Sequence, residues 1–539
     1  MSRRKIPTKA ELIQLQKLYK TDEKIAERLG NITPQLVAYW RRKKNVPKHS
    51  FPKFSKEEVR EIWERFGDDY RCGLELGVSK AAFYNWRRRY GLKDKPAFLK
   101  LEQLELDLGG PEGHRRRNLY GSQTIAQKIL AERMEKEKIE PGAVVSIEPD
   151  LALSNDNAGL VQEKFSGNGH SYVWNPNRIV IPFDHLAFPE VENTAELHRA
   201  VRDFVKRQNI KYFYDFNEGI CHQVVIENAH ILPGQFAVGT DCGITSLGCL
   251  GAFAVSTGLD EMAKLWSDGK YSLTVPSSVK ININGRMAKG VFARDVALFV
   301  ARKIKGESLK GKVVEFYGST VAQMSISERF TLCDQVRELG ALSAIVPFDT
   351  VTRRYLSRRT NMPYRPALAD KDAVYDETYE FNIDSLKPQT ACPHEISNVV
   401  SINEIEGHPI QQVIIGSASN GRFDDLRAAA DILKGKRISR NTRLMICPGS
   451  RQVYLDALKK GLIRAFVDAG GIVMNPSAMP WKVNHQGYLA AGESCMATVV
   501  SNTRGIMGSS ESNVFIASPA TAAATAIKGV ITDPTGYFR

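Results

Sequence analysis

The sequence predicts an α/β core with several domains, preceded by an all-helical region of two similar modules. Three observations support this prediction. The chain has 539 residues, and at roughly 100 to 200 residues per domain this length corresponds to about four folding units. Residues 1–93 contain a repeated helix-turn-helix pattern. Residues 119–537 carry an ordered series of motifs, quoted below, that indicates the fold of the larger part.

The two helical modules are predicted over residues 1–48 and 49–93. In each copy a short helix with apolar residues at helical spacing ends at a glycine, and a capping Thr or Ser then opens a second helix. That second helix carries a tryptophan, Trp40 or Trp86, which we expect in the module core, and it ends in a cluster of cations. This order is typical of helix-turn-helix modules, whose second helix lies in the major groove of DNA.

The positive charge of the chain is concentrated in this region. Residues 1–100 contain 25 Lys and Arg and 12 Asp and Glu, so 25 − 12 = +13 of the total charge of +14 lies there. Cations are favoured at helix ends in any protein, so solvated helix ends are the alternative explanation. Two copies that carry nearly all the charge favour nucleic-acid binding. The predicted DNA contacts are Gln35, Arg41, Arg42, Lys43, Lys80, Arg87, Arg88 and Arg89.

Residues 94–118 are predicted to be a linker, because they combine Pro96, a Gly-Gly-Pro turn signal and a basic run. The eight cysteines are scattered rather than spaced as a disulfide framework, which indicates free thiols and argues against a small secreted scaffold. The sequence has no apolar run of about 18 residues and no signal-peptide pattern. We therefore expect a cytoplasmic protein without membrane contact.

The region 119–539 is predicted to be a single larger unit, because its motifs occur in a fixed order. The most informative motif reads GSASNGRFDDLRAAA over residues 416–430, and a second reads PSAMPWKVNHQG over residues 476–487. Others are GSQTIAQKIL from residue 121, DLAL from 150, FDH from 183, GICHQ from 219, VEFYG from 314 and ASPATAAA from 517. Together they resemble the aconitase and 3-isopropylmalate dehydratase family, and within it the separate large subunit.

This resemblance implies an aconitase-type core of three parallel-sheet subdomains around a polar cleft. It also implies a 4Fe–4S cluster held by three cysteine thiolates. The matching positions in this chain are Ala418, Ala478 and Trp481, and none of these side chains can replace a thiolate as an iron ligand. We therefore expect the cluster to be absent, and predict neither a cofactor nor a metal.

The resemblance also implies which residues line the pocket. The candidate acid–base residues are Asp184, His185, His222, Asp241 and Glu315. Carboxylates beside an imidazole hold it in one tautomer and raise its basicity, which suits it for proton transfer. The candidate substrate-binding residues are Asn155, Ser417, Asn420 and Arg504. The chain departs from the family pattern at Cys242, Gly243 and Ser509, where the family has Ser, His and a second Arg.

Three functions remain open from the sequence. The first is a cluster-free lyase or isomerase, fused to a DNA-binding region, that acts on a small hydroxy or unsaturated carboxylic acid. The second is a DNA-binding regulator that senses a carboxylate through an inactive pocket. The third is a conventional hydro-lyase of the 3-isopropylmalate or homoaconitate type. Because the resemblance is to a large subunit, a small-subunit partner is also expected.

Overall fold

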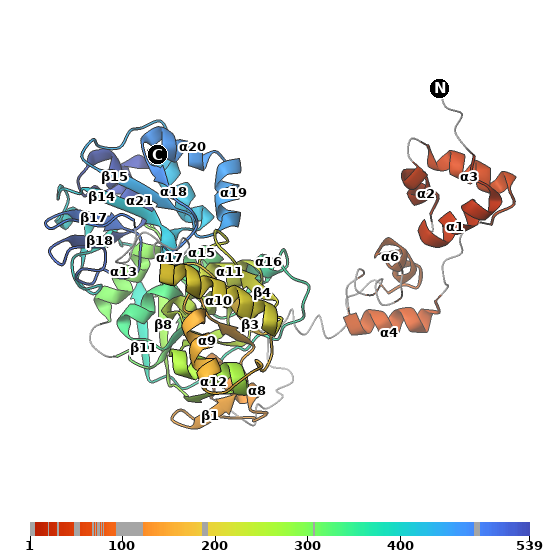
Figure 1. The fold of residues 1–539 in the computed structure, drawn as a ribbon, viewed down its shortest axis with the longest axis horizontal. Helices are drawn as coiled ribbons and strands as arrows, with labels where there is room; N and C mark the ends of the chain where they lie inside the picture. Colours follow the sequence, from red (N-terminus) through yellow and green to blue (C-terminus); the bar gives the residue numbers. More distant parts are fainter. Residues whose placement is uncertain are drawn as a thin grey trace. The chain divides into compact units, whose positions relative to one another are not determined.

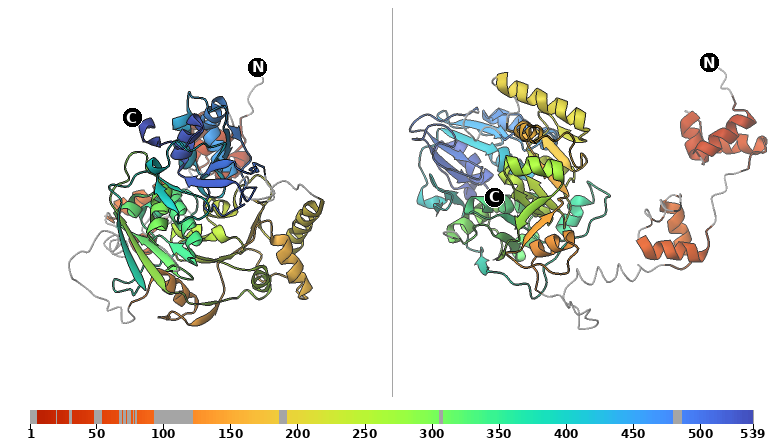
Figure 2. Two further views of the ribbon diagram at one scale, coloured as in Figure 1. Left: turned by 90° about the vertical axis from the view of Figure 1, so that its left-hand side faces the viewer. Right: turned by 60° about the horizontal axis from the view of Figure 1, so that its bottom comes forward.

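The structure is a computed structural model. It describes residues 6–19, 21–29, 32–47, 54–66, 69, 72, 76, 78, 80–92, 122–185, 192–304, 308–478 and 486–538. The chain divides into two compact units, Met1–Arg116 and Arg117–Arg539, and each is described by itself (Figures 1 and 2). The predicted linker, residues 94–118, lies outside the described residues. None of the described helices is long and apolar enough to cross a membrane.

The N-terminal unit has helices in both predicted modules. The first module contains α1 (Lys9–Tyr19), α2 (Asp22–Leu29) and α3 (Pro34–Lys43), and the second contains α4 (Lys56–Phe66) and α6 (Lys80–Arg89). The side chain of Thr33 caps α3 by accepting a hydrogen bond from the N–H of Leu36. Trp40 is buried with Leu12 and Val46, and Trp86 packs edge-to-face on Phe54 at 5.3 Å between ring centroids. Both tryptophans thus belong to module cores.

A five-stranded parallel sheet forms the first layer of the larger unit. Its strand order is β4 (Tyr212–Tyr214), β3 (Ile179–Pro182), β2 (Leu151–Leu153), β5 (Phe236–Gly239) and β6 (Phe253–Ser256). The strands β2, β3 and β5 are buried along their whole length, as expected for a parallel sheet covered on both faces. The accompanying helices are α8 (Ile125–Arg133), α9 (Ala158–Gly167), α10 (Glu192–Gln208), α11 (Cys221–Glu227), the 3-10 helix η1 (Cys242–Leu250) and α12 (Leu259–Asp268).

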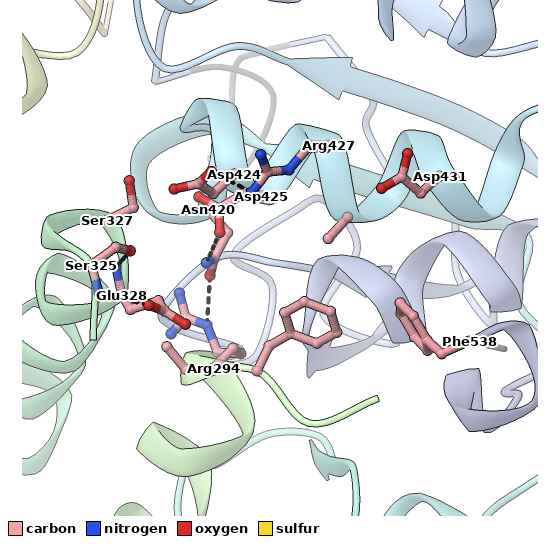
Figure 3. Close-up of a pocket in the computed structure, with 13 residues that line it drawn as sticks. Arg294, Ser325, Ser327, Glu328, Asn420, Asp424, Asp425, Arg427, Asp431 and Phe538 are labelled. Atoms are coloured by element: carbon pink, nitrogen blue, oxygen red, sulfur yellow. Dashed lines mark hydrogen bonds and ion pairs between the residues drawn. The ribbon is translucent and has the colours of Figure 1, made fainter. Parts of the chain in front are cut away.

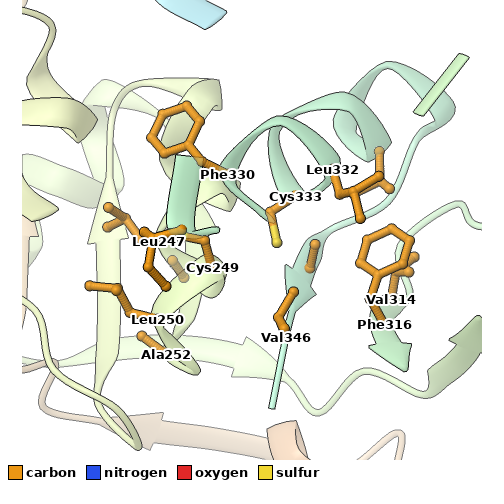
Figure 4. Close-up of a cluster of buried hydrophobic side chains, with 14 of the residues drawn as sticks. Leu247, Cys249, Leu250, Ala252, Val314, Phe316, Phe330, Leu332, Cys333 and Val346 are labelled. Carbon is orange, nitrogen blue, oxygen red and sulfur yellow. The ribbon is translucent and has the colours of Figure 1, made fainter. Parts of the chain in front are cut away.

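A second, four-stranded parallel sheet has the order β10 (Ser343–Ile345), β9 (Val313–Tyr317), β8 (Ser278–Asn284) and β11 (Glu377–Asn382). Its helices are α13 (Ala293–Lys303), α14 (Ser319–Gln323), α15 (Ile326–Gln335), η2 (Val336–Leu339) and α16 (Thr350–Leu356). The antiparallel strands β1 (Val144–Ile147) and β7 (Tyr271–Thr274) pair separately. Phe316 and Phe330 share one buried cluster with Leu247 and Cys249 of η1, so the first two sheets have a continuous core (Figure 4).

The third sheet has seven strands in the order β13 (Val399–Ser401), β12 (Gln389–Ala391), β18 (Asn513–Ala517), β17 (Ser494–Ala497), β14 (Gln412–Gly416), β15 (Arg443–Cys447) and β16 (Ile472–Val473). Only the pairings of β12 are antiparallel. The helices here are η3 (Ile402–Glu404), α17 (Ser417–Asn420), α18 (Phe423–Leu433), α19 (Arg451–Lys459), α20 (Leu462–Ala469), α21 (Pro519–Lys528) and η4 (Pro534–Tyr537). The predicted α/β class with parallel sheets is thus confirmed.

The carboxyl ends of three adjacent strands position the polar residues that the sequence analysis singled out. Asn155 follows β2, the Asp184–His185 pair follows β3, and Asp241 follows β5. Since β3, β2 and β5 are neighbours and run parallel, these residues lie at one edge of the five-stranded sheet. Open α/β sheets commonly bind ligands at this edge.

Candidate active site

The Asp184–His185 pair forms the centre of the polar group. The Nδ1 atom of His185 lies 2.6 Å from Oδ1 of Asp184, and Oδ2 of Asp184 accepts from the N–H of Cys221 at 2.8 Å. The carboxylate of Asp156 fixes the loop by accepting from the N–H groups of Asp184 and His185 at 2.8 and 2.6 Å. The side chain of Asp184 is fully buried, whereas that of His185 is 16% exposed. The pair therefore presents the imidazole, rather than the carboxylate, to solvent.

Asn155 and Asp241 complete the surroundings of the imidazole. The Nδ2 atom of Asn155 lies 3.1 Å from Nδ1 of His185 and donates to Oδ2 of Asp241 at 3.2 Å. The same oxygen of Asp241 lies 3.7 Å from Nε2 of His185, and Oδ1 accepts from the N–H of Gly243 at 2.7 Å. The imidazole thus has a carboxylate near each of its nitrogens, and both carboxylates are held by further hydrogen bonds.

His222, the second residue of α11, connects this group to the seven-stranded sheet. Its Nε2 atom lies 3.1 Å from the carbonyl oxygen of Ala418 in α17. Its Nδ1 atom lies 3.6 Å from Sγ of Cys221 and 3.8 Å from Oδ1 of Asp241. A carbonyl oxygen can only accept, so the neutral ring carries its proton on Nε2 and presents a lone pair on Nδ1.

The loop between β14 and α17 makes a second connection. The N–H of Ala478 donates to the carbonyl oxygen of Asp184 at 2.8 Å, and Oγ of Ser417 donates to the carbonyl oxygen of Ala478 at 2.8 Å. Gly416 has φ 104°, and a Cβ atom there would lie 1.9 Å from the carbonyl oxygen of Cys447. Only glycine fits this close approach, which holds the junction of β14 and α17 against the end of β15.

The electrostatics of the group are dominated by buried carboxylates. Burial raises the pKa of Asp184 above its ordinary value, against the opposite effect of His185. Burial acts in the same direction on Asp156 and Asp241, but the imidazoles beside them outweigh it and hold both pKa values below the ordinary range. Burial, with Asp184 and Asp241 nearby, raises the pKa of the Cys221 thiol well above its usual value.

Arg337 is a candidate that the sequence analysis did not identify. It lies in η2, and its Nη1 atom donates to Sγ of Cys242. Its Nε atom lies 3.6 Å from carboxylate oxygens of both Asp334 and Glu338. Burial would lower the pKa of this guanidinium, but the surrounding acidic groups, Asp241 among them, keep it above its ordinary value. The stretch QVREL has no spacing that distinguishes this arginine from a surface residue.

Glu315 lies outside this group in the hydrogen-bond network. One oxygen accepts from the N–H of Ile125 at 2.7 Å, at the first residue of α8. The other accepts from the hydroxyl groups of Tyr317 and Tyr375 at 2.9 and 2.7 Å. These contacts make Glu315 a buried cap that ties α8 to β9, in place of the acid–base partner that the sequence analysis expected.

Two of the four expected substrate-binding residues are engaged elsewhere. Asn420 is buried, accepts from Nε of Arg294 at 2.8 Å and donates to Asp425 at 2.8 Å. Figure 3 shows it in the wall of a separate pocket of about 320 Å³, between α13, α15 and α18. Arg504 is exposed and donates to the carbonyl oxygen of Ser510 at 3.2 Å. Asn155 is in the central group, and Ser417 supports the loop beside it.

In the N-terminal unit, the structure corrects two of the expected DNA contacts. Arg41 makes a paired hydrogen bond with Asp22, at 3.1 and 3.0 Å, and donates to the carbonyl oxygen of Val46. Arg87 repeats this arrangement with Asp69, at 2.7 and 3.0 Å, and with the carbonyl oxygen of Leu92. Both guanidinium groups are thus used to hold their modules together.

The other expected DNA contacts whose side chains are described are exposed to solvent. Gln35, Arg42 and Lys43 of α3 and Arg88 and Arg89 of α6 are exposed. Lys80 begins α6, and its side chain lies outside the described residues. The exposed set is smaller than the sequence suggested, but it still lies along α3 and α6.

Comparison with known proteins identifies the larger unit. Residues 181–408 and 402–529 match the model of the aconitase family (aconitate hydratase). The chain belongs to the aconitase family. It is 41% identical over 414 residues to the "Probable 3-isopropylmalate dehydratase large subunit" of Methanothermobacter thermautotrophicus, covering 77% of this chain and 99% of that protein. It is 40% identical over 386 residues to the "Probable methanogen homoaconitase large subunit" of Methanosarcina mazei, covering 71% and 98%.

Membership of the aconitase family overturns the expectation of a cofactor-free site, because members of this family normally bind a 4Fe–4S cluster. At two of the positions that the motif resemblance matches to its ligands, Ala418 and Ala478 are buried and offer only methyl groups. The third position, Trp481, lies outside the described residues. These methyl groups cannot bind iron, so the described side chains do not fit a cluster held in the way the family pattern implies. The acid–base chemistry proposed for this site does not involve a cluster.

Proposed function

We propose that the larger unit is a hydro-lyase that removes water from, or adds it to, a small hydroxy or unsaturated carboxylic acid of the 3-isopropylmalate or homoaconitate type. The Asp184–His185 pair carries this proposal, because a partly exposed imidazole on a buried carboxylate is suited to proton transfer. The names of the related proteins support the conventional reaction of the family over the other two functions considered.

In this proposal His185 transfers the proton and its neighbours position it. Elimination of water requires a base for a C–H proton and an acid for the departing hydroxyl group. His185 would accept the C–H proton, and its imidazolium would then donate a proton to the hydroxyl group, which leaves as water. Asp184 stabilises the imidazolium that forms when His185 accepts a proton, and Asn155 fixes the carboxylate of Asp241 beside the ring by donating to it. Arg337 supplies a buried positive charge that acts on Asp241.

The test is the turnover of the His185→Gln variant. We expect kcat to fall by about 10² or more, as is typical for loss of a general acid–base group, while KM stays within about tenfold. The assay follows the absorbance of the carbon–carbon double bond with 3-isopropylmalate and homoaconitate as substrates. His408→Gln is the control, because His408 contacts Ser494 in the seven-stranded sheet. An unchanged kcat in the His185→Gln variant would contradict the proposed role of His185 in proton transfer.

The same assay can test whether the chain needs a small-subunit partner for activity. The related proteins are named as large subunits, and we propose that this chain also acts with a small subunit. Activity is expected to rise when a small-subunit protein of the family is added, and no such rise would show that the chain acts alone.

We propose DNA binding as a second function, located in the N-terminal unit. It is supported by the net charge of +13 in residues 1–100 and by the exposed cations of α3 and α6. Replacing Arg42 and Arg88 together by Ala should weaken retention of the full-length chain on duplex DNA, because phosphate contacts are lost. The control removes two exposed arginines of the larger unit, Arg427 and Arg464. Equal retention of both variants would favour solvated helix ends.

A further inference from the structure

Cys221, His222 and Asp241 bring three metal-binding atoms together. The Sγ atom of Cys221 lies 3.6 Å from Nδ1 of His222, which lies 3.8 Å from Oδ1 of Asp241. The three ligand atoms are all within 4.8 Å of one another. Two atoms that bind one tetrahedral zinc ion, at about 2.0–2.3 Å from the metal, are about 3.3–3.8 Å apart. Small shifts of these side chains would therefore complete a metal-binding face.

The surrounding hydrogen bonds already orient two of these ligands. His222 directs its Nε2–H to the carbonyl oxygen of Ala418, which leaves the lone pair of Nδ1 toward Cys221 and Asp241. Histidines that bind metals typically donate their other N–H to a carbonyl or carboxylate oxygen in this way. Asp241 accepts from the N–H of Gly243 and from Asn155, which fixes its carboxylate.

The charge of the site also favours a cation. Asp241 of this group and Asp156 and Asp184 of a neighbouring group are all buried. The guanidinium of Arg337 is the fixed positive charge beside Asp241, and it is shared with the carboxylates of Asp334 and Glu338. Buried carboxylates in excess of fixed cations are costly unless a proton or a metal ion offsets them.

We propose that Cys221, His222 and Asp241 bind one divalent transition-metal ion of the zinc or ferrous class, with a fourth position open toward His185. A set of sulfur, nitrogen and oxygen donors suits these ions rather than magnesium or calcium. On binding, the Cys221 S–H bond breaks, the sulfur donates its electron pair to the ion, and the proton passes to solvent. This inference does not rest on the hydro-lyase proposal, because it is tested without turnover.

A neighbouring group, Asp156, Asp184 and His185, also has metal-ligand spacing. Its donors are two carboxylates and one imidazole, and it contains no thiol. The first group includes the thiol of Cys221, and sulfur is the donor type that selects zinc and similar ions over magnesium and calcium. We therefore assign the ion to Cys221, His222 and Asp241.

Gly243 offers a way to block this site without removing a ligand. A Cβ atom at this position would lie 2.7 Å from Cε1 of His222 and 2.9 Å from both Nδ1 of His222 and Oδ1 of Asp241. Any side chain here would intrude on the face where the ion is expected. Gly243→Ala should therefore impair metal binding while all three ligands are retained.

The experiment is a titration of the metal-free, full-length protein with Co²⁺. We expect one ion per chain, a near-ultraviolet band from thiolate-to-cobalt charge transfer, and release of about one proton per ion. Cys221→Ser and Gly243→Ala should lose the band and bind cobalt at least tenfold more weakly. Cys242→Ser and Cys249→Ser should retain the band, because the first thiol is exposed next to Asp241 and the second is buried outside the group.

Circular dichroism of each variant confirms that it is folded. If the wild-type protein shows no charge-transfer band at one equivalent of cobalt, the proposal is wrong. A band that persists in Cys221→Ser assigns the ion to another thiol and overturns it as well. Neither outcome depends on catalytic activity, so failure of the metal site and failure of the hydro-lyase proposal are distinguishable.

Discussion

Arg41 and Arg42 are consecutive residues of α3 in different environments. The side chain of Arg41 is 10% exposed and forms its ion pair with Asp22, whose side chain is 15% exposed. Arg42 is exposed, and among the residues that the structure describes it donates to the carbonyl oxygen of Ala38 in its own helix. The contact of Arg41 links α2 to α3 across 19 residues. Two arginines of identical chemistry therefore have different effects on the module.

We predict that Arg41→Ala destabilises the first module and that Arg42→Ala does not. Loss of a nearly buried guanidinium leaves Asp22 unpaired, at a cost of about 2 kcal/mol. Hydrogen exchange of the α2 and α3 amides in the full-length chain should accelerate by about 30-fold in Arg41→Ala and by less than threefold in Arg42→Ala. Equal exchange in the two variants would contradict the structural role of Arg41.

The sequence motifs contained residues that lie together in the central group, but they did not indicate the contacts that hold the surrounding residues in place. Asp184, His185 and His222 lie in short local motifs, and parallel strands bring such motifs to one edge. Arg337 and Glu315 could not be assigned in this way, because their roles depend on contacts across the chain. Glu315, for example, caps a helix that begins 190 residues earlier. Long-range pairing of this kind leaves no periodicity or spacing in the sequence.

At the scale of elements, two separate interactions cap the N-terminus of α8. Thr124 and Gln127 form a capping box at its N-terminus. Glu315 of β9 then accepts from the N–H groups of Ile125 and Ala126, at 2.7 and 3.4 Å, where a negative charge is favoured by the helix dipole. The helix is thus anchored by a strand of another sheet, which the local sequence did not predict.

We predict that Glu315→Gln lowers the melting temperature without abolishing turnover. The variant removes the charge and places an amide N–H₂ group near donors, at a cost of about 2–4 kcal/mol. Below the melting transition, kcat should stay within about threefold of the wild type. Glu404→Gln is a matched control, because Glu404 accepts from the N–H of Ser401 in an exposed cap. A large loss of kcat with an unchanged melting temperature would instead make Glu315 a catalytic residue.

At the scale of the whole molecule, the net charge is concentrated in the first 100 residues. Residues 1–100 carry +13, so 14 − 13 = +1 remains for residues 101–539. The central group of the larger unit contains buried charges that interact over a few ångströms, and salt screens such pairs weakly. Contacts between exposed arginines and phosphates are instead strongly screened, because binding releases counterions. Salt should therefore act on the two proposed functions in different ways.

We predict that DNA affinity falls steeply with salt while catalysis hardly changes. If the exposed cations Arg42, Lys43, Arg88 and Arg89 each neutralise one phosphate, the logarithmic slope is about −3.6, and raising the salt from about 50 to 200 mM should cut affinity about 100-fold. Over the same range kcat/KM should change by less than about threefold, since the proposed acid–base pair is partly buried. Fluorescence anisotropy with labelled duplex DNA and the absorbance assay, on one preparation of the full-length chain, measure both quantities. A salt-independent DNA affinity would contradict phosphate recognition by α3 and α6, and a parallel loss of kcat/KM would show that salt acts on the larger unit itself.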